Sequence, residues 1–353
     1  MKNIPVIVFG TGNVGRTLVQ QIVDSHEIVA GRNHFHFNIV ALVDSRGWQW
    51  HPVGLDDNEL QNIIADKQAG RPLSEDRPDQ EEVLRQLVTA GIERAIVVDT
   101  TAADGMEPVI DMALELDFSV AMANKKPLTG PWPAARRYYN HPKMRYESTV
   151  GGGQPVIATL RYLRDTNDQV FSIEGQLSGT LGYICGRLDE GASFSGALAE
   201  AKARGYTEPD PREDLGGLDV KRKIMILGRL AGWPLEEDDI QVEPLYHPSL
   251  AHLSVAEFME SAIAMDPVIG DRIIAAGHAG QVLRYIARVS QQGGAVGLSG
   301  LSPTSPLANL KYINFRTARY DDEPLMIAGK GAGLEMTAAG VLGDMIALVR
   351  ETY

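Results

Sequence analysis

The stretch GYTEPDPREDLGGLDVKRK, from Gly205 to Lys223, gathers side chains of types that can bind and transform a small charged molecule. Apolar residues recur at helical spacing over residues 218–230 and predict a helix there. Asp219 and Lys223 are four residues apart on one flank of that helix, close enough to pair. The stretch is rich in both charge signs: Glu208, Asp210, Glu213, Asp214 and Asp219 are its acids, and Arg212, Lys221, Arg222 and Lys223 its bases.

Two of these acids, Glu208 and Asp214, precede the predicted helix in a loop that contains two prolines. Proline stiffens the backbone, which suits carboxylates that have to hold a fixed position. A solvated loop would have the same composition, and an exposed Asp219–Lys223 pair would contribute only about 0.3–0.5 kcal/mol. The stretch alone therefore fits both a surface loop and an active site.

Among the residue types of the stretch, a lysine is the remaining candidate for a proton donor. Hydride transfer to a carbonyl creates an alkoxide, which needs a proton donor and commonly finds it in histidine. None of the eight histidines lies in this stretch or at the strand ends described below. A lysine ammonium carries a proton at neutral pH, and a neighbouring carboxylate such as Asp219 helps to hold that charge.

A glycine-rich loop near the N-terminus has the pattern of a dinucleotide-binding turn. Gly10, Thr11, Gly12, Asn13, Val14 and Gly15 follow an apolar strand at residues 5–9 and precede a helix. In this context the first glycine permits a tight turn, the second lets a pyrophosphate approach the backbone, and the third lets the helix pack on the strand. A glycine-rich turn without a ligand is the alternative.

The last residue of the second predicted strand (38–44) and a residue just after it concern the choice of nucleotide. Asp44 is placed to bind an adenosine ribose, which favours NAD, whereas Arg46 is placed to meet a 2′-phosphate, which favours NADP. The sequence leaves both alternatives open.

Further apolar runs at 95–99 and 118–123 and a run from Met144 alternate with helical segments, which predicts a doubly wound parallel sheet. The groups that follow these runs should face one crevice: Thr100-Thr101, Asn124-Lys125-Lys126 and Glu147-Ser148-Thr149. A solvated lysine pair is the alternative for Lys125 and Lys126. Residues 46–78 fit the alternation poorly and are interpreted as an insertion, and beyond residue 150 the pattern is that of an α+β domain.

The composition of the chain argues against several classes of partner and compartment. The 353 residues carry a net charge of −13, which argues against nucleic acid or an anionic membrane as partner, since both need clustered positive charge. The single cysteine allows no internal disulfide and, with no secretory leader or membrane span in the sequence, predicts a soluble cytoplasmic protein. There is no Cys/His metal motif.

With these residues in view, the chain resembles the homoserine dehydrogenases. The stretch 205–223 matches the most distinctive motif of that family almost throughout. The supporting segments are GTGNVG, VVDTTAADG, ANKKPL, YESTVGGGQPV, LSGTLGYI and GKGAGLEMTAAGVLGDM. Residues 46–78 and 235–320 carry little of the resemblance.

The resemblance implies NAD(P)-dependent interconversion of L-homoserine and L-aspartate 4-semialdehyde, on the route to threonine, methionine and isoleucine. It places the substrate near Gly205, Glu208 and Asp214, makes Asp219, Lys223 and Lys125 the catalytic residues, and adds Thr101, Lys125 and Gly333 to the cofactor site. It also implies a sodium ion bound by Glu147, Val150, Gly152 and Gln154. Such a site would consist mostly of oxygen ligands from the backbone, as a hard cation prefers.

The family fold implies three parts and a homodimer. We expect a Rossmann-type dinucleotide-binding domain over residues 1–150 and an α+β catalytic and dimerisation domain over 151–320. The segment 321–353 would return to the first domain. We expect neither a C-terminal regulatory domain, and hence no threonine feedback through one, nor a preceding kinase domain, both of which some members carry. Leu181-Gly182 replaces a larger polar residue common in the family.

Two alternatives remain. Another oxidoreductase of similar architecture could act on a different amino acid semialdehyde, and a screen of substrates would separate the two. The chain could also be a cofactor-binding regulator without catalysis. A decayed enzyme would be expected to lose a carboxylate or a lysine from the motif, and Glu208, Asp214, Asp219 and Lys223 are all present.

Overall fold

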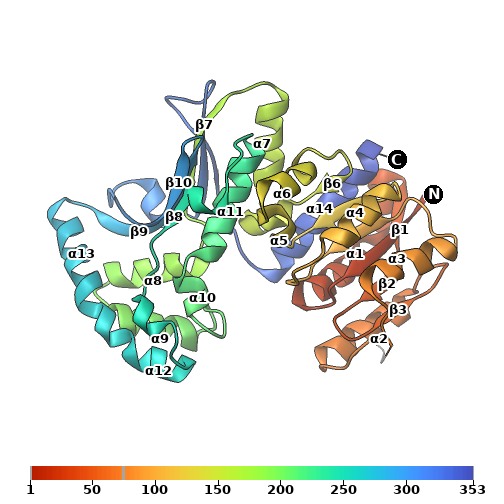
Figure 1. The fold of residues 1–353 in the computed structure, drawn as a ribbon, viewed down its shortest axis with the longest axis horizontal. Coiled ribbons are helices and arrows are strands. Elements are labelled where there is room, and N and C mark those ends of the chain that lie inside the picture. The colour runs from red at the N-terminus through yellow and green to blue at the C-terminus, as the bar shows by residue number, and fades with distance from the viewer. Residues whose placement is uncertain (1, 74–75, 353) are drawn as a thin grey trace. The chain divides into compact units, whose positions relative to one another are not determined.

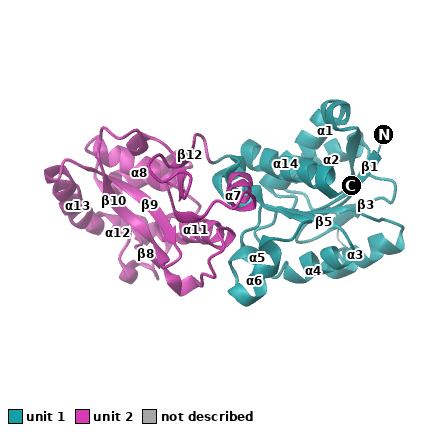
Figure 2. Ribbon diagram, turned by 90° about the horizontal axis from the view of Figure 1, so that it is seen from above, with its two compact units in different colours: residues 1–157, 332–353 teal, residues 158–331 magenta. Residues whose placement is uncertain are grey.

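The computed structural model describes residues 2–73 and 76–352, which form two compact units. Unit 1 comprises residues 1–157 and 332–353, and unit 2 comprises residues 158–331 (Figure 2). Both units are mixed α/β structures, and each has a sheet of six strands. Within the described residues, no helix combines the length and the apolar character that crossing a membrane requires.

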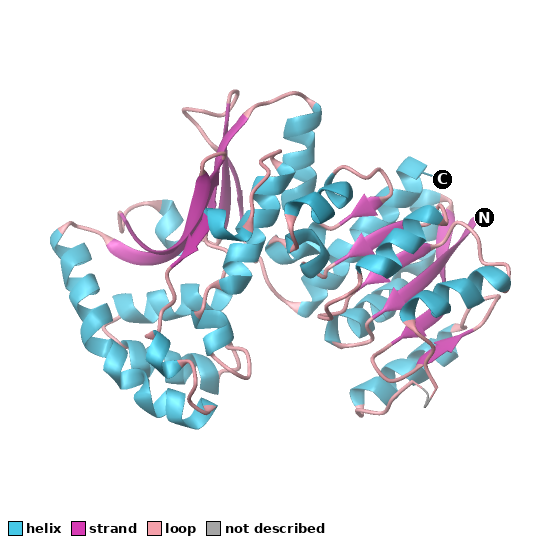
Figure 3. Ribbon diagram, viewed as in Figure 1, coloured by secondary structure: helices cyan, strands magenta, loops and turns pink. Residues whose placement is uncertain are grey.

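The sheet of unit 1 has the strand order β3-β2-β1-β4-β5-β6, and only β3 runs antiparallel to its neighbour. Its inner strands are continuous apolar runs because both of their faces are covered by helices (Figure 3). The strands are β1 (Lys2–Phe9), β2 (Phe35–Val43), β3 (Trp48–Trp50), β4 (Ile96–Asp99), β5 (Ser119–Met122) and β6 (Met144–Arg145).

The helices of unit 1 pack on this sheet, and the last of them comes from the end of the chain (Figure 1). They are α1 (Asn13–Asn33), α2 (Asp57–Gln68), α3 (Gln80–Thr89), α4 (Glu107–Glu115), α5 (Lys126–Thr129), α6 (Trp132–Tyr139) and α14 (Leu334–Thr352). One core cluster joins Leu18 of α1, Val341 of α14 and Ile63 of α2 to β1 and β2. The C-terminal helix is therefore part of the hydrophobic core of unit 1.

Of residues 46–78, the part from β3 to the end of α2 is integrated into unit 1. The strand β3 adds an antiparallel edge to β2, and α2 follows with its first turn closed by a capping box between Asp56 and Glu59. Leu60 and Ile64 of α2 are buried in the core cluster described above. The expected alternation of strands and helices did not predict this packing. The segment adds β3 to the sheet antiparallel to β2, whereas the alternation predicts only parallel strands joined by helical crossovers.

The run from Met144 forms a strand over two residues only. It continues as two 3-10 turns, η1 (Glu147–Thr149) and η2 (Gly151–Gly153), and then enters α7 (Val156–Asp165), which spans the boundary of the two units. The three glycines of η2 all have positive φ values, 75°, 55° and 94°, a conformation that few other residues adopt.

The sheet of unit 2 has the strand order β12-β11-β7-β9-β10-β8 and is antiparallel except for the β10–β8 pair. Its strands are β7 (Val170–Gly175), β8 (Ile240–Val242), β9 (Val282–Ser290), β10 (Gly293–Leu301), β11 (Tyr312–Thr317) and β12 (Leu325–Ala328). Its helices are α8 (Gly179–Asp189), α9 (Phe194–Ala203), α10 (Arg212–Leu215), α11 (Leu218–Leu230), α12 (Val255–Ser261) and α13 (Asp266–His278). Short 3-10 turns occur at η3 (Glu237–Asp239), η4 (Pro248–Leu250), η5 (Ala262–Met265) and η6 (Pro306–Asn309).

Candidate active site

The glycine loop joins β1 to α1 and has room for a ligand at one glycine only. A Cβ atom on Gly15 would lie 1.8 Å from the carbonyl oxygen of Gly10, so helix and loop pack too closely for any side chain there. A Cβ atom on Gly12 would meet no heavy atom of the described residues within 4 Å. The hydroxyl of Thr11 is buried and has no hydrogen-bond partner among the described residues. These features fit a pyrophosphate at the N-terminus of α1.

The loop after β4 is hydrogen-bonded to the glycine loop through Thr100. Thr100 donates from its backbone N–H to the carbonyl oxygen of Phe9 (2.9 Å) and from its hydroxyl to that of Gly10 (2.7 Å). The carboxyl ends of β1 and β4 are thereby joined at the point where a parallel sheet binds its ligands.

Asp99, the last residue of β4, organises the two loops that carry Thr101 and Lys125. Its Oδ1 accepts from the N–H (2.9 Å) and the hydroxyl (2.7 Å) of Thr101, and its Oδ2 accepts from Nδ2 of Asn124 (3.0 Å). Asn124 also donates to the carbonyl oxygen of Ala103 (3.0 Å). One fully buried carboxylate therefore fixes both strand ends, and Lys125 follows directly after Asn124.

This carboxylate is costly to ionise. Burial raises the pKa of Asp99 from 3.8 to about 6, although the hydrogen bonds from Thr101 and Asn124 favour the charged form. Because the folded protein holds the proton more tightly than the unfolded chain, the free energy of unfolding falls as the pH rises from 3.8 to 6. The shift corresponds to about 3 kcal/mol across that window.

Replacing Asp99 by asparagine should therefore remove a pH-dependent part of the stability. Denaturant unfolding of both proteins at pH 4.5 and pH 7.5 should show the wild type losing about 2 kcal/mol relative to Asp99→Asn between the two values. Asp104→Asn is the matched control, because the side chain of Asp104 is 87% exposed in the same loop. Parallel pH profiles for wild type and Asp99→Asn would contradict the burial cost.

Asp44 follows β2, where an adenosine ribose was predicted, and its carboxylate already has three donors. Oδ2 lies 2.5 Å from Nζ of Lys67, and Oδ1 accepts from the N–H groups of Arg46 and Gly47, both at 2.7 Å. Burial alone would raise the pKa of Asp44, but Lys67 and the two N–H groups outweigh it and lower the pKa. Arg16 donates to the carbonyl oxygen of Lys67 (2.8 Å), which fixes the end of α2.

The residues of the predicted sodium site lie in one compact turn that packs on α14. Glu147 is buried, and its Oε1 accepts from the N–H of Ile157 (2.6 Å), while its own N–H donates to Asp344 (2.7 Å). Val150, Gly152 and Gln154 lie in the same turn within seven residues of Glu147. One buried carboxylate beside several backbone carbonyl oxygens is a donor set that suits a hard cation.

Gly333, the last predicted residue of the cofactor site, precedes α14 in unit 1. Its carbonyl oxygen accepts from the N–H (3.0 Å) and the hydroxyl (2.9 Å) of Thr337 in the first turn of the helix. Unit 1 thus holds every residue predicted for the cofactor and for sodium.

Unit 2 holds the residues predicted for the substrate, in a loop that begins at the end of α9. Gly205 has a φ of +69°, and the N–H groups of Gly205 and Tyr206 donate back to the carbonyl oxygens of Lys202 and Ala201. This is a Schellman motif, which ends the helix and releases the chain into the loop.

Within this loop, Asp214 is half-buried and holds the loop closed. Its Oδ2 accepts from the N–H of Glu208 (2.8 Å). Burial raises the pKa of Asp214, and the bonds from Glu208 and from the hydroxyl of Thr180 offset part of that effect. A carboxylate in this environment gains from a positively charged ligand, which would replace the solvation that it has lost.

Lys223 lies on α11 directly after the loop. Its Nζ is 2.7 Å from Oδ2 of Asp219 and donates to the carbonyl oxygen of Leu177 at 2.8 Å. The ammonium group is largely shielded, with 18% of the side chain exposed, whereas Asp219 is half exposed. The carboxylate of Asp219 and the carbonyl oxygen of Leu177 together fix the position of the ammonium group.

Sequence analysis gave no role to four residues that the structure places at or beside the predicted sites. Lys67 had no signal, because its segment was interpreted as an insertion. Asp99 ends a predicted strand, yet only the position of Asn124 on the neighbouring strand shows that its carboxylate joins two loops. Asp210 and Arg212 were counted among the charges of the motif without a role.

The fold and the glycine loop place unit 1 among the dinucleotide-binding proteins. It has a Rossmann-type doubly wound fold, and its glycine loop has open space beside Gly12. A profile of the homoserine dehydrogenase family matches residues 155–346. The homoserine dehydrogenase of Schizosaccharomyces pombe is 33% identical, over 99% of this chain and 96% of that protein. The chain therefore belongs to the homoserine dehydrogenase family, whose members are NAD(P)-dependent oxidoreductases.

Two further relatives extend the comparison. The chloroplastic bifunctional aspartokinase/homoserine dehydrogenase 2 of Arabidopsis thaliana is 33% identical over 97% of this chain, which spans only 38% of the length of the plant protein. A hyperthermophilic archaeal homoserine dehydrogenase, solved in complex with NADPH, superposes with a TM-score of 0.75 at 22% identity and covers 99% of both chains. The latter likeness concerns the fold.

Proposed function

We propose that this protein is a cytoplasmic NAD(P)-dependent homoserine dehydrogenase that interconverts L-aspartate 4-semialdehyde and L-homoserine in threonine, methionine and isoleucine biosynthesis. The observation that carries the proposal is the shielded ammonium group of Lys223, held by Asp219 and the carbonyl oxygen of Leu177 beside a loop of carboxylates. The family membership supports the same activity.

In this proposal unit 1 binds the nucleotide and unit 2 binds the amino acid. When bound, the nicotinamide would supply or accept the hydride. Lys223 gives its proton to the carbonyl oxygen as the semialdehyde is reduced, and takes it back from the hydroxyl group in the oxidation. Asp219 holds the ammonium group in place between turnovers.

The carboxylates of the loop would bind the amino acid end of the substrate. Asp214 has a raised pKa because it is partly desolvated, so an ammonium group on the ligand offsets that cost. Glu208 lies beside it, its backbone already fixed by the bond to Asp214. Lys125, fixed through Asn124 and Asp99, is the second catalytic lysine of the proposal.

A sodium ion in the turn of Glu147, Val150, Gly152 and Gln154 would have a structural role. The turn carries Ser148, whose hydroxyl donates to the carbonyl oxygen of Thr337 on α14 (2.7 Å). Ion binding there would stiffen the connection between the sheet and the C-terminal helix. We further propose a homodimer formed by the second domain, in line with the family resemblance.

The direct test is the initial rate of NADP⁺ and NAD⁺ reduction with L-homoserine at alkaline pH, which favours oxidation because a proton is released. Turnover with homoserine and none with other short hydroxy amino acids would support the proposal. Folded protein that binds NADP but turns over neither nucleotide would overturn it.

Of the two nucleotides, we infer that NADP is preferred. The carboxylate of Asp44 already accepts from Lys67 and two backbone N–H groups, so a ribose hydroxyl would have to compete with these donors. Lys67, Arg46 and Arg16 provide positive charge around it, which suits a 2′-phosphate.

Replacing Lys67 by glutamine should shift this preference. We expect the ratio of kcat/KM for NADP to that for NAD to fall about tenfold or more, since the variant loses a charged phosphate contact and releases Asp44. Arg71→Gln is the control, because Arg71 pairs with Asp66 on the exposed surface just after α2. An unchanged ratio in Lys67→Gln would show that the 2′ position is recognised elsewhere.

A further inference from the structure

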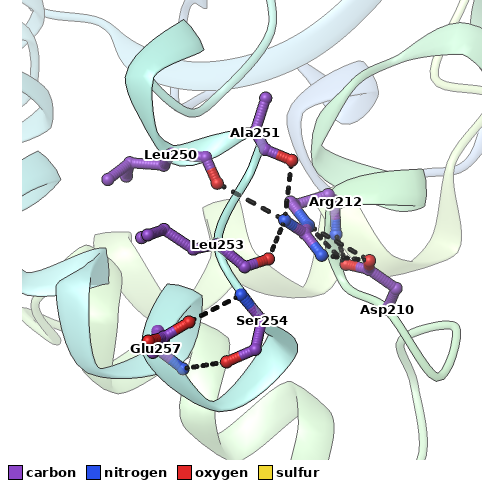
Figure 4. Close-up of polar contacts among 7 residues, drawn as sticks. All are labelled: Asp210, Arg212, Leu250, Ala251, Leu253, Ser254 and Glu257. Atoms are coloured by element: carbon purple, nitrogen blue, oxygen red, sulfur yellow. Dashed lines mark hydrogen bonds and ion pairs between the residues drawn. The ribbon is translucent and has the colours of Figure 1, made fainter.

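Two charged residues of the motif, Asp210 and Arg212, have no part in the proposed chemistry but lie between Glu208 and Asp214 in the substrate loop. The guanidinium group of Arg212 reaches out of the loop to a distant segment (Figure 4). Its Nη1 donates to the carbonyl oxygens of Leu253 (2.6 Å), Ala251 (2.9 Å) and Leu250 (3.4 Å). Three carbonyl groups of one turn therefore converge on one nitrogen.

Asp210 holds this guanidinium group in place. Its Oδ2 accepts from Nη2 of Arg212 at 2.6 Å and its Oδ1 from Nε at 2.9 Å, a two-pronged pair that matches the fork of arginine. Oδ1 also accepts from the backbone N–H of Arg212 at 3.0 Å. Arg212 lowers the pKa of Asp210, so the pair stays charged well below neutral pH.

The surface that Arg212 contacts is itself rigid. Arg212 lies over the ring of Phe258, with 5.3 Å from Cζ to the ring centroid, and that ring is buried. The helix α12 behind it begins with a capping box, in which Ser254 and Glu257 exchange backbone and side-chain hydrogen bonds (Figure 4). Only 15% of the arginine side chain is exposed, so the guanidinium group is largely shielded from solvent.

We propose that Arg212, aimed by Asp210, is a positioning residue that holds the substrate loop on residues 250–253 and so fixes Asp214 and Glu208 for the substrate. Arg212 and Asp214 lie in the same short helix, α10, so a movement of one displaces the other. The role assigned to these carboxylates rests on the proposed function; the clamp itself rests on the contacts above.

The test compares Arg212→Met and Arg212→Lys with the wild type in homoserine oxidation. Methionine removes every donor, whereas lysine keeps the charge and can reach one or two of the carbonyl groups. We expect KM for L-homoserine to rise about tenfold or more in Arg212→Met and less in Arg212→Lys, with kcat changed less than about threefold. The affinity for NADP, which unit 1 binds, should stay within about twofold.

Ser254→Ala is the matched control, since it removes the side-chain cap of α12 but none of the donors or acceptors that join Arg212 to Asp210 and to residues 250–253. It should lower stability and leave KM for homoserine unchanged. Equal KM values in wild type, Arg212→Met and Arg212→Lys would overturn the proposal, as would a rise in Ser254→Ala as large as that in Arg212→Met. If Arg212→Met fails to fold, KM for homoserine is compared among Arg212→Lys, Asp210→Asn, Ser254→Ala and wild type. The proposal then requires a higher KM in the first two variants only.

Amide hydrogen exchange separates this proposal from the proposed function. The N–H of Glu208, bonded to Asp214, should exchange faster in Arg212→Lys than in wild type or Ser254→Ala. Faster exchange in an enzyme that does not oxidise homoserine would leave the clamp standing and overturn the function. Unchanged exchange and KM in a wild type that does oxidise homoserine would overturn the clamp alone.

Discussion

Lys223→Met is expected to reduce kcat by about 10²–10⁴-fold in both directions while leaving NADP binding intact. Methionine keeps the length of the side chain but cannot give or take a proton. The ammonium group is 2.7 Å from Oδ2 of Asp219 and 2.8 Å from the carbonyl oxygen of Leu177, so its position on α11 is fixed by two acceptors. Steady-state rates with homoserine and with the semialdehyde, together with NADP titration, measure the effect.

The folding cost of this change should be small, because Asp219 is half exposed and can be solvated when its partner is lost. Lys221→Met is the matched control: Lys221 lies two residues earlier on the same helix and pairs with Glu237 at 3.6 Å. It should keep kcat within about twofold of wild type. A Lys223→Met protein that retains more than about a tenth of the wild-type kcat would remove Lys223 from the role of proton donor.

Local spacing explains what the sequence could predict about this site. Asp219 and Lys223 are one helical turn apart, so their pairing follows from the periodicity of α11 and is present in the structure. The glycine loop is equally local, since its strand, turn and helix are contiguous. The order of the parallel strands brings Thr101 and Lys125 to one edge of the sheet by the same kind of argument.

Side chains that meet through tertiary packing could not be predicted in this way. Lys67 reaches Asp44 from 23 residues away because α2 packs on the core, and nothing in the periodicity of α2 specifies its partner. Arg212 binds carbonyl oxygens 38 to 41 residues further along, and backbone acceptors have no signature in a sequence. Asp99 and Asn124 lie at neighbouring strand ends, but only side-chain orientation makes them a bonded pair.

Gly12→Ala and Gly15→Ala should separate nucleotide binding from folding. A methyl group on Gly12 meets no described heavy atom within 4 Å, and its φ of −69° suits alanine, so this variant should be as stable as wild type. The same methyl group occupies the space in which a pyrophosphate would approach the backbone. We expect the Kd for NADP to rise about 100-fold in Gly12→Ala with no change in the free energy of unfolding.

Gly15→Ala should behave differently, because its Cβ would lie 1.8 Å from the carbonyl oxygen of Gly10 and 2.9 Å from the hydroxyl of Thr100. The helix would have to move away from the strand, which costs about 1–3 kcal/mol of stability and also displaces the donors at the start of α1. Calorimetric titration with NADP and denaturant unfolding of the same three proteins decide the matter. Unaltered NADP affinity in Gly12→Ala would mean that the open space beside Gly12 is not where the nucleotide binds, and the cofactor site in unit 1 would have to be assigned elsewhere.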